Sequence, residues 1–141
     1  MMRRITGLFI ALLAFTFQIN AQSLTENEII GRWSVVEVKV LTRLPEGIQK
    51  TIDQLKEAFL RSKFEFKNDN SFTFDFELNK MRIQNGHWKY NDNTKSFIIQ
   101  DWKDKDSGKW KLMEIFTKKE VDKITFQIHD LFIELTMNKE Y

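Results

Sequence analysis

The sequence predicts a mainly β protein: an antiparallel, up-and-down, eight-stranded β-barrel with one amphipathic helix between the first and second strands. Three observations support this fold class. Apolar and polar residues alternate with period two along most of the chain after residue 31, which is typical of strands with one buried and one solvated face. Residues that favour turns separate these segments at short, regular intervals. One segment shows helical spacing instead.

The first 21 residues have the anatomy of a removable export signal. Arg3 and Arg4 are followed by an apolar run from Ile5 to Phe17 and by Ile19-Asn20-Ala21, a small-residue cleavage pattern. A membrane anchor is the alternative, but the apolar run is shorter than the roughly 20 residues that a spanning helix needs. We therefore expect cleavage after Ala21, one domain over residues 22–141 without an integral membrane span, and a periplasmic or secreted location.

Composition argues against several classes of partner. Removing 21 of the 141 residues leaves 120, a usual size for one domain with one core. The net charge of +2 comes from the two arginines of the signal, so 20 basic and 20 acidic residues remain. A neutral, mixed surface argues against nucleic acid as a partner. Because the chain has no cysteine, packing alone must stabilise the domain.

The first predicted strand, residues 33–41, is followed by the helical segment. Ile48, Ile52, Leu55 and Phe59 are spaced four, three and four apart, with polar residues between them, which predicts an amphipathic helix over 45–61. Such a helix either covers apolar surface at one end of the barrel or acts as a lid over a ligand entrance.

An aromatic hairpin comes next. Its strands, 63–67 and 71–78, flank the turn Asn68-Asp69-Asn70, and phenylalanines alternate with polar residues along both. The alternating residues are Phe64, Phe66, Phe72, Phe74 and Phe76. Such alternation predicts two antiparallel strands with one apolar face.

Five further strands are predicted over 81–90, 96–102, 109–116, 123–129 and 131–137. Eight strands is the number at which a barrel closes around its own side chains or one small ligand. Within 81–90 the apolar phase changes between Ile83 and Trp88. An extra residue at Asn85-Gly86, a β-bulge with Gly86 in a left-handed conformation, would explain the change.

Several motifs together give the chain a family resemblance. Gly31-Arg32-Trp33 follows a short amphipathic lead at 24–30, a helix follows the first strand, and Gly86-His87-Trp88-Lys89-Tyr90 comes after the Phe-rich hairpin. In this pattern the sequence resembles the lipocalin-like, calycin-type exported proteins of Bacteroidetes bacteria, with Gly31, Trp33, Gly86 and Trp88 as its structural motif.

The sequence also departs from the lipocalin pattern. In lipocalins an Arg near the last strand usually covers the motif Trp. No Arg follows Arg82 here, so that cover is absent or is replaced by Lys139. The family's Thr-Asp-Tyr loop motif is also missing.

The resemblance implies non-covalent binding of a small hydrophobic ligand inside the barrel. Seven apolar side chains are candidates for the lining, and Arg82 for contact with a ligand carboxylate. The lining candidates are Phe64, Phe66, Phe72, Phe74, Phe76, Phe126 and Ile128. Side chains this bulky could instead fill the interior. A filled barrel would then act through its surface as a protein-interaction or inhibitor module in the cell envelope, and Trp102 and Trp110 are candidates for such a patch.

Catalysis has little support in the sequence. His87 and His129 are the only histidines, and neither stands in a pattern that predicts a metal site or a general base with a nucleophile. The sequence has no Gly-x-Ser-x-Gly elbow and no phosphate loop. We therefore expect no enzymatic activity, no cofactor and no metal.

Overall fold

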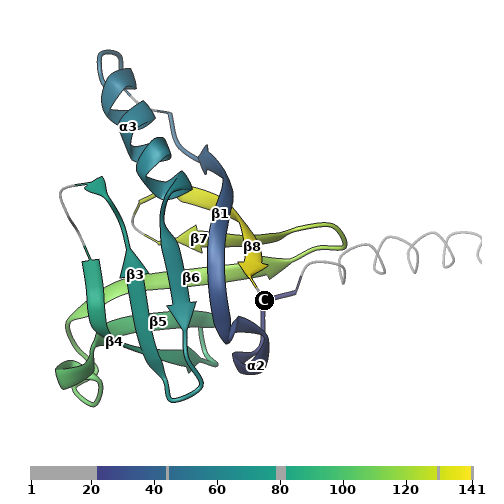
Figure 1. The fold of residues 1–141 in the computed structure, drawn as a ribbon, viewed down its shortest axis with the longest axis vertical. Helices are drawn as coiled ribbons and strands as arrows, with labels where there is room; N and C mark the ends of the chain where they lie inside the picture. The colour runs from purple at the N-terminus through teal and green to yellow at the C-terminus, as the bar shows by residue number, and fades with distance from the viewer. Residues whose placement is uncertain (1–21, 44, 79–81, 130, 141) are drawn as a thin grey trace, which may run out of the picture.

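The computed structural model describes residues 22–43, 45–78, 82–129 and 131–140, and their strands form one closed barrel (Figure 1). Each strand pairs antiparallel with the next in sequence, and the first pairs with the last. The strands are β1 Gly31–Val40, β2 Lys63–Phe66, β3 Ser71–Asp75, β4 Arg82–Asn91, β5 Ser96–Asp101, β6 Lys111–Lys119, β7 Ile124–Ile128 and β8 Ile133–Glu140. The predicted fold class is confirmed; the predicted export signal lies outside the described residues.

The helix between β1 and β2 is present but shorter than predicted. This helix, α3, spans Gln49–Leu60 rather than 45–61, because Gly47 has a φ of +94° and Ile48 is not helical. Its C-terminal half packs on the barrel end, where the Phe59 ring lies 4.7 Å from that of Phe76. Its N-terminal end projects away from the barrel (Figure 1). None of the described helices is long and apolar enough to cross a membrane.

The predicted bulge in β4 is confirmed, but the predicted role of its glycine is wrong. Phe72 pairs with Gly86 and Phe74 with Ile83, so β4 carries one extra residue between these pairs. Gly86 does not have a positive φ. It is instead required by a close approach, because a Cβ on Gly86 would lie 2.8 Å from the Phe72 carbonyl oxygen.

Most strand ends differ from the prediction by one to three residues. β3 ends at Asp75, so Phe76 lies beyond the strand, although it is still buried. β6 continues to Lys119 instead of ending at Phe116, because its last residues pair with β7 and because Lys119 exchanges backbone hydrogen bonds with Gln22.

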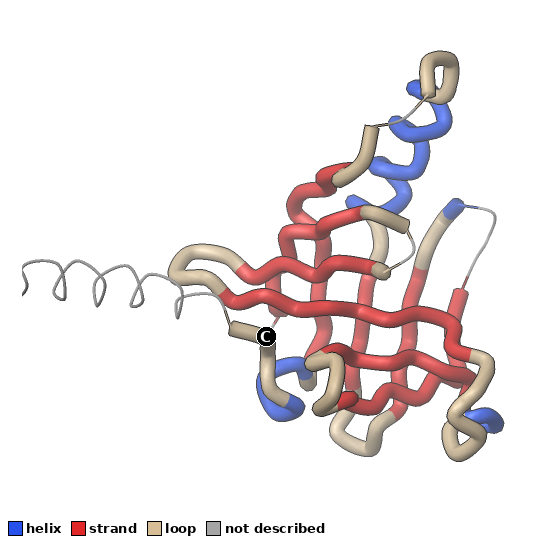
Figure 2. The backbone as a smooth tube through the Cα atoms, turned by 180° about the vertical axis from the view of Figure 1, so that it is seen from behind, coloured by secondary structure: helices blue, strands red, loops and turns tan. Residues whose placement is uncertain are grey.

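A short helix and a lysine close the end of the barrel opposite α3. The helix α2, Glu26–Ile29, begins with a capping box between Thr25 and Glu28, and Figure 2 shows it far from α3. Trp33 packs beneath α2 and donates its Nε1 proton to the Ile29 carbonyl oxygen at 2.8 Å. Lys139 Nζ lies 5.4 Å from the Trp33 ring centroid and donates to the Glu28 carbonyl oxygen. Lys139 therefore provides the cover for Trp33.

Candidate functional site

Aromatic rings fill the half of the barrel interior nearest α2. We call this group the aromatic core; its members are Trp33, Phe64, Phe66, Phe72, Phe97 and Phe126, and all are fully buried. The Phe66 ring lies 4.9 Å from Phe72, 6.1 Å from Phe97 and 6.2 Å from Phe126. Such centroid distances are those of rings in direct contact. The rings pack on one another across the barrel axis.

The predicted lining residues therefore lie together, but mostly in contact with each other. Phe64, Phe66, Phe72 and Phe126 belong to the aromatic core. Phe74 and Phe76 stack on each other with centroids 5.5 Å apart, nearer to α3, and Ile128 is buried on β7. Their side chains all point into the barrel, which explains why they alternate with polar residues along their strands.

Arg82 is not brought together with these residues. Its side chain is 61% exposed, and its Nε lies 2.9 Å from the Asp75 carboxylate. This pair links β3 and β4 on the solvated face of the barrel wall, where a surface ion pair contributes little stability.

At the α3 end, apolar side chains point inward but stay partly exposed. Val38 pairs with Leu135, Ile83 with Phe74, and Met113 with Ile99. Each partner is a buried, inward-facing residue, and directly opposed residues on neighbouring strands share a face. The partly buried Val38, Ile83 and Met113 therefore also face inward. Together with Leu55 of α3 and Leu78, which are also partly buried, they form what we call the barrel mouth.

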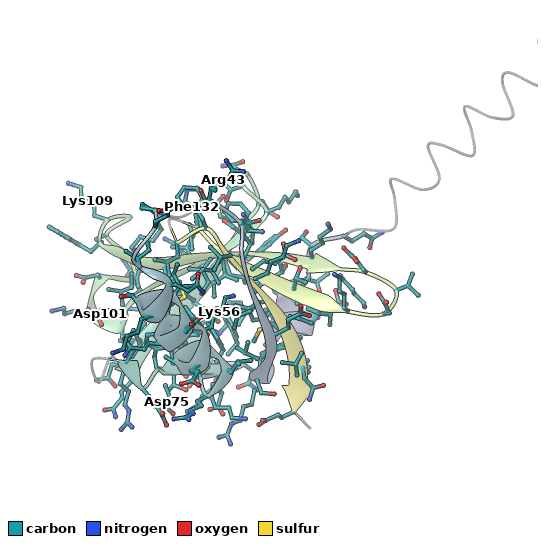
Figure 3. All side chains as sticks on the ribbon, turned by 90° about the horizontal axis from the view of Figure 1, so that it is seen from above. Arg43, Lys56, Asp75, Asp101, Lys109 and Phe132 are labelled. Carbon is teal, nitrogen blue, oxygen red and sulfur yellow. The ribbon has the colours of Figure 1, made fainter. Side chains whose placement is uncertain are left out.

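A pocket of about 550 Å³ lies beside the mouth, between the end of β1 and α3. It combines apolar and charged groups: Val40 and Ile52 are apolar, Arg43 and Lys56 are basic, and Glu46 is acidic. Figure 3 looks onto this end of the molecule and shows Lys56 on α3 and Arg43 at the upper edge of the molecule.

A second hollow of about 680 Å³ lies on the outer wall of the barrel. We call it the outer cleft; its lining residues are Asp69, Ser71, Gln84, Asn85, Gly86, Asp101, Trp102 and Lys103. They come from the β2–β3 turn, β3, β4, the end of β5 and the 3-10 turn Trp102–Asp104. Sequence reasoning missed this site, because polar residues on separate strands carry no spacing that links them. The available signals were the predicted bulge and Trp102, which the sequence offered only as part of a surface patch with Trp110.

His87 stands next to the outer cleft. Its ring packs edge-on against Trp102 at a centroid distance of 5.3 Å, and its buried Nδ1 has no hydrogen-bond partner. Burial lowers the pKa of His87 below its usual value, and the neighbouring charges of Lys105 and Lys89 lower it further. His129 packs against Phe116. Within the described ranges, no group of three or more His, Asp or Glu side chains could hold a metal ion.

Two aromatic side chains are strongly exposed on loops at the α3 end. Trp110 is 73% and Phe132 59% exposed, and both have a positive φ, of 60° and 53°, which is unusual for bulky residues. Their loops join β5 to β6 and β7 to β8, which in an up-and-down barrel lie at the same end as the β1–β2 connection. The predicted pair of Trp102 and Trp110 is divided between the outer cleft and this rim.

Comparisons with models of known protein families, with curated proteins and with solved structures found no match for this chain.

Proposed function

We propose that this protein binds a small, mainly apolar molecule without covalent chemistry, and that the ligand enters at the barrel mouth. The observation that carries the proposal is the contrast between the two ends of the barrel. Side chains near α2 are fully buried, whereas inward-facing Val38, Ile83 and Met113 remain partly exposed. Apolar surface that faces inward and stays open to solvent is typical of a ligand entrance.

The aromatic core limits where such a ligand would bind. Because Phe64 and Phe66 already contact other rings, the ligand would lie above Phe74 and Phe76 rather than among the core rings. In the adjoining pocket Arg43 and Lys56 outnumber the one acidic residue, Glu46, and would favour a ligand with an anionic or hydrogen-bond-accepting end. The proposal therefore describes an amphipathic molecule with its apolar part in the mouth.

The proposal includes export. Cleavage after Ala21 would release the barrel into the periplasm or the medium as a carrier of such molecules, without enzymatic activity. N-terminal sequencing of the protein from its own host tests the cleavage, and native mass spectrometry of the same sample tests for a bound molecule.

The binding site itself is tested by two adjacent residues of β6. Met113 faces into the mouth, whereas Leu112 is exposed on the outside. We expect Met113→Glu to weaken binding of the fluorescent apolar probe anilinonaphthalene sulfonate at least tenfold, about 1.4 kcal/mol, because a carboxylate in the mouth is costly to desolvate. Leu112→Glu adds the same charge on the other face and should leave the affinity within about twofold.

A second variant controls for the possibility that Met113→Glu does not fold. Met113→Trp fills the mouth without adding charge, so it should also weaken probe binding while thermal unfolding stays cooperative. Equal affinities in folded Met113→Glu, Met113→Trp and Leu112→Glu would place the ligand elsewhere and contradict the proposal.

A second candidate function is favoured by the exposed rim. A barrel filled by its own side chains could recognise another envelope protein through Trp110 and Phe132, since exposed aromatic residues are enriched at interfaces. A photo-crosslinking residue at position 110 should then capture one partner in the host, and the same residue at position 95, in the turn between β4 and β5, should not. Crosslinks of equal yield at both positions would argue against this function.

A further inference from the structure

We infer that the outer cleft is a binding site for a neutral saccharide, separate from the barrel mouth. The first element of the argument is the bulge in β4. In a regular strand, consecutive side chains point to opposite faces, but Gln84 and Asn85 are both exposed. The extra residue therefore places two carboxamides side by side on the outer wall, where each offers two donors and an acceptor.

Trp102 supplies an aromatic wall for this cleft. Its side chain is 41% exposed and is held in place by the edge-on contact with His87 and by Lys105 Nζ, 5.4 Å from its ring centroid. The turn that carries Trp102 is anchored by the buried Gln100, which donates to the Lys109 and Asp104 carbonyl oxygens at 2.8 and 3.3 Å. The ring is thus positioned before any ligand binds.

Two carboxylates complete the polar side of the cleft. Asp69 accepts hydrogen bonds from the Ser71 backbone nitrogen and hydroxyl, both at Oδ1, and these bonds hold the pKa of Asp69 below its usual value. Neither of these two bonds uses Asp69 Oδ2, which is left to accept one from a ligand. Asp101, the last residue of β5, also lines the cleft.

This combination of groups matches the chemistry of a sugar ring. A pyranose has an apolar C–H face that packs on an aromatic ring, and hydroxyl groups at its edge that hydrogen bond in pairs to amides and carboxylates. The backbone of Gly86 lies between these side chains in the lining of the cleft. The volume of about 680 Å³ lies within the usual range for small-molecule sites.

The charge of the lining argues for a neutral saccharide over an anionic ligand. Two aspartates and one lysine line the cleft, so a phosphate or sulfate group would meet net repulsion. Hydroxyl groups instead donate to the carboxylates and accept from the amides and the lysine.

The test is a titration of the isotope-labelled protein with glucose, galactose, N-acetylglucosamine and their β-linked disaccharides, followed by amide NMR. We expect at least one of these sugars to bind with a dissociation constant of about 10 mM or tighter, with shifts concentrated at residues 84–86 and 101–103. Trp102→Ala should weaken this binding at least tenfold. Trp110→Ala removes a more exposed tryptophan outside the cleft and should change the affinity less than twofold.

Asn85→Ala provides a second variant that leaves the aromatic wall intact, and it should weaken binding at least threefold. The proposal is overturned if none of these sugars shifts residues 84–86 and 101–103, or if Trp102→Ala and Trp110→Ala bind equally well. None of the residues whose NMR shifts or substitutions are measured lies in the barrel mouth. The result therefore does not depend on whether an apolar ligand binds there.

Discussion

Replacing Phe66 by alanine tests most directly whether the barrel is filled at its α2 end. The Phe66 side chain is fully buried and contacts the rings of Phe72, Trp88, Phe97 and Phe126 at centroid distances of 4.9 to 6.2 Å. Removing it deletes the transfer free energy of a phenyl ring and leaves a cavity whose rigid aromatic walls cannot collapse. Substitutions of this kind lower the free energy of unfolding by about 3–5 kcal/mol.

Such a loss is a large part of the stability expected for one domain, about 5–15 kcal/mol. Urea unfolding followed by tryptophan fluorescence measures it, since Trp33 and Trp88 are both buried. The midpoint should fall while the slope of the transition stays unchanged. Phe132→Ala is the control, because that ring is 59% exposed and its loss should cost less than about 1 kcal/mol.

The cavity left by Phe66→Ala also provides a gain-of-function readout. A dry cavity lined by aromatic rings should bind benzene, so saturating benzene should raise the unfolding midpoint of Phe66→Ala more than that of the wild type. A loss below about 1.5 kcal/mol, or equal stabilisation of both proteins by benzene, would mean that the interior already holds open space and would refute the packing argument.

Three further predictions concern particular contacts. Gly86→Ala should lower the free energy of unfolding by about 1–3 kcal/mol in urea titrations, because the new Cβ would lie 2.8 Å from the Phe72 carbonyl oxygen. The lowered pKa of His87 means that the unfolded chain binds this proton more tightly, so thermal stability should fall as the pH drops below about 6.5, and His87→Gln should reduce that dependence. Lys139→Met should cost about 1–2 kcal/mol in urea, since it removes both the charge over Trp33 and the hydrogen bond to the Glu28 carbonyl oxygen; an unchanged midpoint would show that the cover contributes nothing.

The strands could be predicted because one physical rule, burial of alternate side chains, operates along the whole barrel. Between Phe64 and Phe76 phenylalanines alternate so regularly with polar residues that the hairpin is evident without a structure. The helix boundary was less predictable. Apolar spacing extends back to Ile48, but the backbone of Gly47 and Ile48 prevents the helix from starting before Gln49.

The bulge shows which part of a local feature sequence can reveal. A change of phase between Ile83 and Trp88 requires an extra residue, and the pairing of β3 with β4 contains one. The reason for Gly86 could not be predicted, because it depends on how closely the neighbouring strand approaches. The contact of Lys139 with Trp33 could only be offered as one of two alternatives, since it joins residues 106 positions apart in the chain.

The same bulge links the two proposed binding surfaces. Ile83 faces the barrel mouth, while Gln84 and Asn85, which follow it directly, face the outer cleft. A strand without the extra residue could present Gln84 outward only by turning Asn85 inward against the aromatic rings, where an unpaired carboxamide is costly to bury. If Ile83 kept its pairing with Phe74, a strand without the bulge would also turn the buried Trp88 to the outer face, because a one-residue slip reverses every side chain that follows it. The polar wall outside and the apolar wall inside therefore depend on one irregularity in β4.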